Sequence, residues 1–268
     1  MIYKELEKEF AKYVNRRYAV AVNSGTSALH LALLALGVGP GDEVIVPDLT
    51  FVACAFAVSY TGAKPIFVDV KDDYTIDQSL IVGKITKRTK AIMAVHLYGN
   101  QCDMPSILKI AKIHHLKVIE DCSEHHLVEL SKSDVACYSF QSSKQIHCEE
   151  GGIIVTNNRK LADECSKLKT FYHTKGDYFH KKLSFNYRMP DSQAKLAILS
   201  MYSFKKISHT WVYPIICDSL KEKKELIKRG ARPFFQPLSI MPMYKQKVGK
   251  NALKLSKLGV VIPYEYTK

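Results

Sequence analysis

The sequence lacks the features that mark several large classes of protein. No stretch of about eighteen apolar residues occurs in the 268-residue chain, so no membrane-spanning helix is predicted. The N-terminal segment MIYKELEKEFAKYV is charged throughout, which predicts an amphipathic helix rather than a secretory signal. No GxGxxG motif follows the first expected strand and no P-loop motif occurs, which argues against sites of those two nucleotide-binding types.

The cysteines show no metal-binding or disulfide pattern. Seven are scattered along the chain, and none forms a CxxC pair. An odd, unpatterned set without a signal peptide predicts free thiols in a reducing cytoplasm. The same spacing argues against zinc, and no metal site is predicted.

Negative charge is scarce relative to positive charge. The 39 Lys and Arg residues against 26 Asp and Glu residues leave a formal net charge of +13. Nucleic acid, an anionic small substrate or simply a lysine-rich enzyme surface would each account for this excess. The lysines occur as singles and pairs, densest at 221–232, and the tyrosines are not interleaved with arginines along one element. This distribution argues against a nucleic-acid partner.

What the sequence does contain is a regular alternation of short β-branched runs and helical stretches. The pattern predicts an α/β fold with a mostly parallel sheet and helices on both faces. A change of pattern after residue 170 predicts a large domain over 1–200 and a small, shortened α/β domain over 201–268. The expected strands are 18–23, 43–47, 64–70, 90–99, 117–121, 134–140 and 151–156, and the expected helices are 24–37, 50–62, 104–116 and 159–170.

Polar residues gather just after these strands, where ligands bind in open α/β sheets. NSGTSAL opens a helix with small residues, which predicts either a phosphate site or an ordinary cap by Ser24 with Thr26 or Ser27. VIEDCSEHH ends a strand with Asp121. That carboxylate would hold a protonated ring nitrogen, orient a histidine, bind a metal or cap a helix.

A single lysine, Lys144, stands between two apolar runs in CYSFQSSKQIHCEEGG. It is either a solvated loop residue or a lysine whose lowered pKa suits it to Schiff-base chemistry. Ser139 ends the preceding strand and is placed to donate to a phosphate. A phosphate cradle, an acid for a pyridinium nitrogen and a Schiff-base lysine together specify pyridoxal 5'-phosphate.

These motifs resemble the pyridoxal-phosphate-dependent sugar-nucleotide aminotransferases of the DegT type, which have the aspartate-aminotransferase fold, fold type I. The resemblance covers about residues 3–204 and 229–266. It rests on VNSGTSALHLAL, GVGPGDEVIVPDLTFVACAFAVSYTGAKPIFVDV, VHLYGNQCDM, VIEDCSE, YSFQSSKQIHCEEGG and FNYRMPDSQAKL.

The resemblance implies roles for individual residues. Lys144 matches the lysine that binds the cofactor as a Schiff base and shuttles the proton, and Asp121 matches the partner of the pyridinium nitrogen. Phe51 matches the aromatic residue that stacks on the cofactor ring. Asn186 matches an asparagine that reaches the phosphate of the neighbouring subunit, which implies a homodimer with shared active sites. The phosphate cradle is matched by Gly25, Thr26 and Ser27, with the hydroxyl of Ser139.

The resemblance also implies a reaction. An amino-acid donor, usually glutamate, would convert the cofactor to its amine form. That form would aminate a nucleotide-diphosphate-linked keto-deoxysugar at C3 or C4, for amino-sugar or surface-polysaccharide biosynthesis, with Lys144 as the acid/base in both halves. Relatives that deoxygenate the sugar carry His at this position, so the lysine argues against that sister reaction.

Two residues depart from the family pattern beside the expected cofactor. Glu124 stands where the family usually has Gln or sometimes His, near the cofactor's phenolic oxygen. Because a carboxylate would repel a phenolate, we expect this cofactor-binding position to be protonated, turned away or replaced in its role by His125. Glu149 stands where the family has Gly or Ala, and its side chain is expected to crowd the site.

The chain is also short for this family. The stretches between Asp121 and Ser139 and between Met201 and Gly230 are abbreviated, although ARPFFQPL at 231–238 still resembles the family's Arg-Pro-aromatic segment. Substrate-contacting surface is expected to be reduced. The alternative to an enzyme is therefore a degenerate paralogue with a regulatory or structural role.

Overall fold

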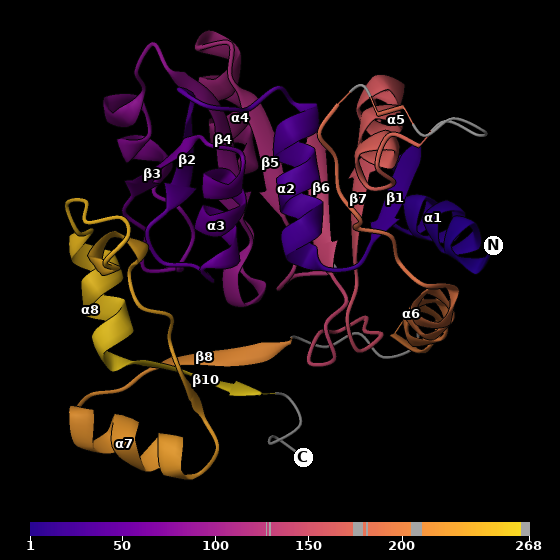
Figure 1. Ribbon diagram of the computed structural model, residues 1–268. Coiled ribbons are helices and arrows are strands. Elements are labelled where there is room, and N and C mark those ends of the chain that lie inside the picture. The colour runs from indigo at the N-terminus through magenta and orange to yellow at the C-terminus, as the bar shows by residue number, and fades with distance from the viewer. Residues whose placement is uncertain (127, 129, 174–178, 181, 205–210, 264–268) are drawn as a thin grey trace.

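The structure is a computed structural model, and it describes residues 1–126, 128, 130–173, 179–180, 182–204 and 211–263 (Figure 1). The helices are α1 (Ile2–Tyr13), α2 (Gly25–Ala35), α3 (Ala53–Tyr60), α4 (Met104–Ile113), α5 (Arg159–Leu168), α6 (Asp191–Phe204), α7 (Leu220–Lys228) and α8 (Lys250–Leu258). The strands are β1 (Tyr18–Val22), β2 (Glu43–Pro47), β3 (Lys64–Val68), β4 (Thr89–Val95), β5 (Lys117–Asp121), β6 (Val135–Ser139), β7 (Gly152–Thr156), β8 (Val212–Ile216), β9 (Arg232–Pro233) and β10 (Gly259–Pro263).

The main sheet has seven strands within the described residues, in the order β1-β7-β6-β5-β4-β2-β3. The neighbours from β6 to β3 pair in parallel, whereas β7 is antiparallel to both β6 and β1. One strand therefore runs against the others, which confirms the predicted mostly parallel sheet. Because β2 to β6 share a direction, their C-terminal ends meet at one edge of the sheet.

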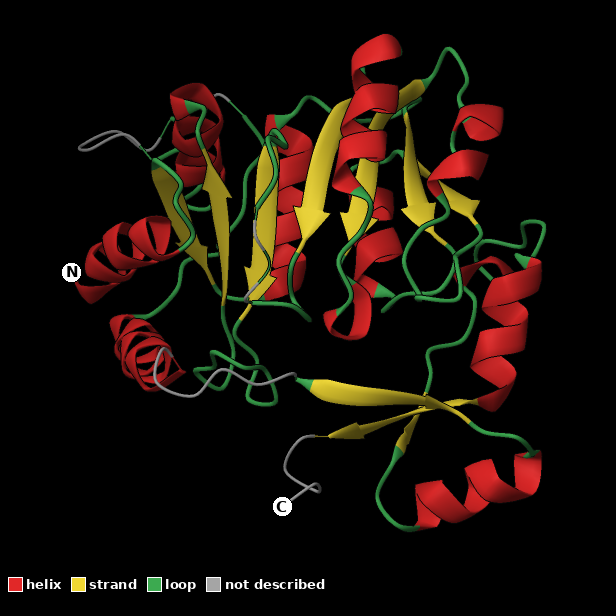
Figure 2. Ribbon diagram, turned by 180° about the vertical axis from the view of Figure 1, so that it is seen from behind, coloured by secondary structure: helices red, strands yellow, loops and turns green. Residues whose placement is uncertain are grey.

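Helices cover both faces of this sheet (Figures 1 and 2). On one face, α2, α3 and α5 share an apolar cluster that includes Leu31 and Cys165. On the other face, α1 and α6 pack around Phe10 and Tyr138, whereas α4 packs against β4 and β5, with Ile107 in a separate apolar cluster. Every residue of β2 and β7 is buried, as expected for strands covered on both sides.

The C-terminal part of the chain forms a separate antiparallel sheet in the order β8-β10-β9 (Figure 2). A small cluster of Cys217, Ala231 and Val260, with Leu226 of α7 against it, forms its core. The chain enters this lobe after α6, and α6 runs continuously through the predicted boundary at residue 200. The division into domains of 1–200 and 201–268 stays a prediction.

Two carboxylates at neighbouring strand ends fasten the C-terminal lobe to the main sheet. Asp48, directly after β2, is 1% exposed and accepts hydrogen bonds from Ser239 N (2.8 Å), Ser239 Oγ (2.8 Å) and Gly249 N (2.9 Å). Asp69, directly after β3, accepts from the N–H groups of Asn251 and Ala252 at the start of α8. The negative charge also suits the positive end of that helix.

Asp48→Ala is expected to destabilise the fold by about 3 kcal/mol or more, because it leaves two backbone N–H groups and a hydroxyl without their acceptor in a buried place. Urea unfolding at neutral pH measures the loss. Asp72→Ala is the control, because Asp72 is 81% exposed and its ion pair with Lys254 spans 3.7 Å. The control should change stability by no more than about 0.5 kcal/mol. Equal effects of the two changes would contradict the fastening role of Asp48.

The predicted elements agree with the observed ones over the first part of the chain. The strand expected at 117–121 is found at Lys117–Asp121, and the helix expected at 24–37 is found at Gly25–Ala35. Gly37 follows that helix at φ +80°, the left-handed conformation predicted for its cap. All seven cysteines are buried and free of disulfides. Within the described part of the chain, no helix combines the length and apolarity needed to cross a bilayer.

Candidate active site

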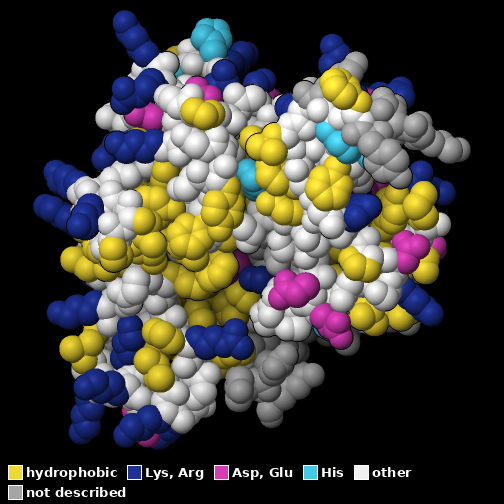
Figure 3. All heavy atoms as spheres, in the orientation of Figure 1, with side chains coloured by type: hydrophobic (Ala, Val, Ile, Leu, Met, Phe, Trp, Pro, Cys, Tyr) yellow, Lys and Arg dark blue, Asp and Glu magenta, His cyan; other side chains and the backbone are white. Residues whose placement is uncertain are grey.

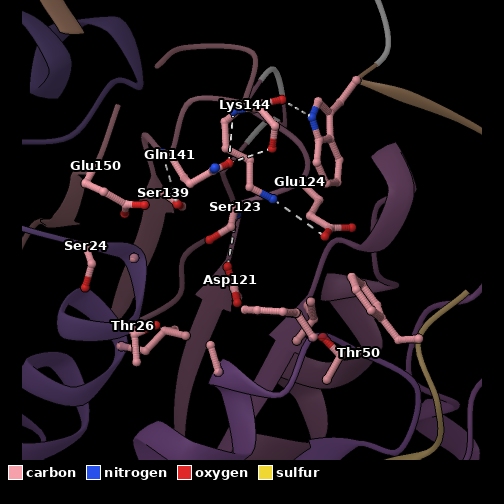
Figure 4. A pocket seen from close by; sticks show the side chains of 18 of the residues that line it. Ser24, Thr26, Thr50, Asp121, Ser123, Glu124, Ser139, Gln141, Lys144 and Glu150 are labelled. Atoms are coloured by element: carbon pink, nitrogen blue, oxygen red, sulfur yellow. Dashed lines mark hydrogen bonds and ion pairs between the residues drawn. The ribbon is translucent and has the colours of Figure 1, made fainter. Parts of the chain in front are cut away.

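A cavity of about 370 Å³ lies at the C-terminal edge of the main sheet, lined both by residues at the strand ends and by residues of the C-terminal part of the chain. Strand ends and the turn after β6 supply most of its wall (Figure 4). Most of the predicted site residues line it, namely Gly25, Thr26, Phe51, Asp121, Glu124, Ser139 and Lys144. Residues that were not predicted as site residues also line it, among them Ser24, Glu150, Trp211, Arg232 and Phe235.

The N-terminus of α2 forms one end of the cavity. Ser24 caps the helix, because its Oγ accepts a hydrogen bond from Ser27 N at 3.1 Å. The two hydroxyl oxygens of Ser24 and Ser27 lie 2.9 Å apart. Ser27 is 7% exposed and does not line the cavity, so it supports the cap instead of joining the predicted cradle. The cap is therefore present, and Gly25 and Thr26 line the cavity beside it, where an anion site stays a prediction.

Two glycines allow this helix end to pack closely on the sheet. A Cβ atom at Gly25 would lie 2.7 Å from Ser139 Cβ, and one at Gly152 would lie 2.5 Å from Ser24 O. Both positions are thus restricted to glycine by space rather than by backbone dihedral angles. No local pattern in the sequence indicates the role of Gly152, because β7 and the N-terminus of α2 are brought together only by the tertiary fold.

The acid of the site lies deeper, at the end of β5. Asp121 is 5% exposed and receives hydrogen bonds from Cys54 Sγ (3.2 Å) and Ser123 N (3.0 Å), both uncharged donors. Burial raises the pKa of the Cys54 thiol well above its ordinary value, so the thiol keeps its proton and donates. Among the described residues, no cationic side chain lies within ion-pair distance of Asp121. The cavity thus holds a carboxylate that favours a cationic partner.

Lys144 lies in the turn between β6 and β7, where its N–H donates to Gln141 O at 2.8 Å. Its side chain is 13% exposed, and its Nζ lies 3.6 Å from Glu124 Oε1 and 3.7 Å from the centroid of the Trp211 ring. Burial lowers the pKa of the amine below its ordinary value, although the carboxylates of Glu124 and Asp121 oppose the shift. Lys144 is therefore not a solvated loop residue.

Glu124 points into the cavity toward Lys144 (Figure 4). Its Oε2 accepts a hydrogen bond from Tyr98 N at 3.1 Å. Burial raises the pKa of Glu124 above its ordinary value, against the lowering effect of the lysine. The alternative that Glu124 turns away is wrong, because Glu124 lines the cavity and faces Lys144. His125 does not line the cavity, so it is not placed to take over the role of Glu124.

Glu149 does not crowd the site, so that expectation is wrong. Its exposed side chain accepts a hydrogen bond from Gln193 Nε2 at 3.0 Å and does not line the cavity. The backbone of Glu149 has φ +68°, in the left-handed region that favours glycine. The departure from the family pattern therefore affects the backbone conformation, and the neighbouring Glu150 is the residue that faces the cavity.

Phe51 and Asn186 differ in their placement. Phe51 lines the cavity, is 52% exposed and lies 5.6 Å from Phe235 between ring centroids, so it presents an open aromatic surface. Asn186 is exposed and accepts a hydrogen bond from Arg188 Nε at 2.9 Å, away from the cavity of its own chain. A role for Asn186 in a neighbouring subunit stays a prediction.

Some lining residues carried no usable signal in the sequence. Trp211, the only tryptophan of the chain, lies in no motif and reaches Lys144 through the path of the C-terminal lobe. Arg232 and Phe235 belong to ARPFFQPL, so that motif could have identified them. Cys54 follows Phe51 in TFVACAF and could have been noted as a small polar group facing the strand ends.

The residues present fit pyridoxal 5'-phosphate. A helix N-terminus without interfering Cβ atoms suits the phosphate, and a buried carboxylate without a cationic partner suits the protonated ring nitrogen. A lysine with a lowered pKa suits a covalent bond to the aldehyde. Phe51 offers its ring for stacking between these groups.

Comparison with known proteins gives concordant matches. A family model, described as the DegT/DnrJ/EryC1/StrS aminotransferase family, matches residues 2–212. The GDP-perosamine synthase of Escherichia coli O157:H7 is 37% identical over 311 aligned residues, which cover 97% of this chain and 84% of that protein. The GDP-perosamine synthase of Caulobacter vibrioides is 44% identical over 205 residues, which cover 74% of this chain and 55% of that protein.

Among solved structures, NtdA from Bacillus subtilis with bound cofactor PMP superimposes with a TM-score of 0.88. It is 28% identical, and the match covers 98% of this chain and 72% of that one. The match to the Caulobacter protein spans only about half of that protein's length. The alignment to the Escherichia coli protein is longer than the 268 residues of this chain, so that relative carries insertions and this chain is the shorter of the two; the location of the abbreviated stretches stays a prediction.

Proposed function

The chain belongs to the DegT/DnrJ/EryC1/StrS aminotransferase family, and on that premise we propose that it is a pyridoxal-phosphate-dependent transaminase. It would move an amino group from an amino acid, glutamate being the first candidate, to a nucleotide-linked keto-deoxysugar. One observation carries the proposal: Lys144, Asp121 and the N-terminus of α2 converge on one cavity at the strand ends. Two relatives named as GDP-perosamine synthases support a nucleotide-linked sugar as the acceptor.

The cofactor would be held at three places. The N–H groups of Gly25 and Thr26, with the Ser139 hydroxyl, would bind its phosphate. Asp121 would keep the ring nitrogen protonated, and Phe51 would stack on the ring face. When bound, pyridoxal phosphate supplies a ring that withdraws electrons from the carbon attached to the amino nitrogen.

The chain's own residues would manage the protons. The lowered pKa of Lys144 increases the fraction of free amine, which is both the nucleophile toward an aldehyde and a base for a carbon-bound proton. Trp211 covers the amine from the side of the C-terminal lobe and limits its contact with water. Arg232 adds a second cation to the cavity wall, where it would attract a carboxylate or phosphate of a substrate.

Oligomeric state and cellular location are two further points that the sequence and the buried cysteines bear on. We propose a homodimer in which Asn186 serves the neighbouring site, and a cytoplasmic location that keeps the seven buried thiols reduced. Lys and Arg side chains are scattered around the rim of the face in Figure 3, while hydrophobic side chains form a broad band across it. This arrangement supports a protein partner on that face better than a nucleic acid.

An absorbance experiment tests the function. The purified protein with added pyridoxal phosphate should show a visible band that glutamate converts to the spectrum of the amine form. The aminated protein should then transfer the group to a GDP-linked keto-deoxysugar, detected by mass spectrometry of the product. A band that no amino donor changes would indicate a damaged first half-reaction. The lack of any band would contradict the enzyme and favour a non-catalytic paralogue with a regulatory or structural role.

A further inference from the structure

Glu124 is in direct contact with the reactive amine, and the proposed function gives it no proton to carry. Its Oε1 lies 3.6 Å from Lys144 Nζ in a cavity that shields both groups from water. We propose that Glu124 is a second catalytic acid–base residue, which exchanges one proton with Lys144 during the reaction. The inference deepens the proposed function and rests on it. The exchange is balanced within the pair, because ammonium plus carboxylate becomes amine plus carboxylic acid.

The carboxyl group is held for this contact. Its other oxygen, Oε2, accepts the hydrogen bond of Tyr98 N at 3.1 Å. Tyr98 has φ 52° and ψ 30° inside the short helix η3 (Leu97–Gly99), a left-handed conformation that is unfavourable for a bulky residue. The buried Tyr98 side chain is fixed in turn, since its hydroxyl accepts from Phe235 N at 3.1 Å. One oxygen of Glu124 is therefore anchored, and the other faces Lys144.

Burial brings the proton affinities of the two groups together. It raises the pKa of Glu124 and lowers the pKa of Lys144, and each group's charge opposes the shift of the other. A smaller difference in pKa lowers the free energy of moving a proton from the amine to the carboxylate. Two groups coupled in this way titrate as a pair that holds one proton over a wide pH range.

The other groups around the pair do not replace Glu124. Asp121 raises the pKa of both Glu124 and Lys144, but among the described residues the ion pair of Lys144 is with Glu124, and Asp121 is reserved for the cofactor's ring nitrogen in the proposed function. Arg232 of β9, which also lines the cavity, lowers the pKa of Lys144. Other titratable side chains near the pair, among the described residues, include Cys54 of α3, Tyr98 of η3, His125 and His126 after β5, His147 in the turn and Glu150 before β7.

The residue type is what makes the inference specific. A glutamine at this position would offer a hydrogen bond of similar reach but could not take up a proton. Glu124→Gln therefore removes the acid–base function while it keeps the size and the bond from Tyr98. Glu149→Gln is the matched control, because Glu149 lies near the same turn but its side chain binds Gln193 outside the cavity.

The experiment measures the free amine of Lys144 and its proton transfer separately. The full-length chain, stripped of cofactor, is mixed with pyridoxal phosphate and trapped with borohydride between about pH 5 and about pH 10, and the modified lysine is identified by peptide mass. In the loaded protein, exchange of the α-hydrogen of glutamate is followed in deuterated water. Circular dichroism checks the fold, and Glu124→Asp, which retracts the carboxyl group, serves as the second variant.

Glu124→Gln is expected to shift the trapping profile of Lys144 by at least about one pH unit to lower pH, because the carboxylate that raises the lysine pKa is gone. Trapping near neutral pH should then be about tenfold faster, and the wild-type profile with two ionisations should reduce to one. Exchange of the α-hydrogen should slow by on the order of 10²-fold. Glu149→Gln should match the wild type in both, and Glu124→Asp should lie between the wild type and Glu124→Gln.

Two other results would overturn the inference. Trapping and exchange that are both unchanged in Glu124→Gln, or a shifted profile with unchanged exchange, would leave Glu124 without a proton-transfer role while the proposed function stands. A chain in which Lys144 is not trapped in any variant would instead remove the proposed function itself.

Discussion

Lys144→Ala is expected to abolish covalent attachment of pyridoxal phosphate and to reduce transamination by on the order of 10³-fold or more. The reason is geometric, because Lys144 is the only lysine that lines the cavity among the described residues. The phosphate cradle and Asp121 would remain, so the variant should still bind the cofactor without a covalent bond. Borohydride trapping followed by mass spectrometry separates these two modes of binding.

A second lysine with an acidic partner provides the control for this change. Lys117 forms an ion pair with Asp134 at 3.2 Å, but it is 48% exposed and lies at the opposite end of β5 from Asp121. Lys117→Ala should keep trapping and activity at the wild-type level. Covalent attachment that persists in Lys144→Ala would show that another amine reaches the cofactor, and the assignment of Lys144 would then be wrong.

Elements and site residues could be predicted from the sequence where a local pattern is enough to fix their position in the fold. Near-continuous apolar runs predicted buried strands, and the ends of parallel strands must meet at one edge of a sheet. Lys144, Asp121 and Gly25 were therefore predicted as neighbours, although 119 residues separate the first from the last. All three line the same cavity in the structure.

What the sequence could not predict depends on contacts between distant segments. Trp211 approaches Lys144 only because the C-terminal lobe returns to the turn after β6. The direction of the Glu124 side chain depends on the left-handed backbone of Tyr98, which no local pattern indicated. The family resemblance identified Glu149 as an unusual residue. What is unusual about it in the structure is its positive φ angle, not crowding of the site by its side chain.

The NSGTSAL motif contains both a feature that could be predicted from the sequence and features that could not. Small residues after β1 correctly predicted the start of a helix, and this end lies at the cavity, where the anion site stays a prediction. Which of these residues face the cavity was not predictable, because Ser27 turns back to cap the helix with Ser24. The close packing of β7 at Gly152 against Ser24 and Gly25 also carried no local signal in the sequence.

Gly152→Ala is expected to destabilise the fold by about 3 kcal/mol and to weaken cofactor binding at the same time. The added Cβ would lie 2.5 Å from Ser24 O and 2.8 Å from Gly25 N, both backbone atoms that cannot rotate away. Either β7 or the N-terminus of α2 must move, so the phosphate cradle is lost together with the packing. Gly39→Ala is the control, since a Cβ there meets no atom within 4 Å and its φ is not positive. Thermal unfolding and a pyridoxal phosphate titration followed by Trp211 fluorescence measure the two effects. A Gly152→Ala protein with the stability and cofactor affinity of Gly39→Ala would mean that the sheet and the cradle are not in contact as described.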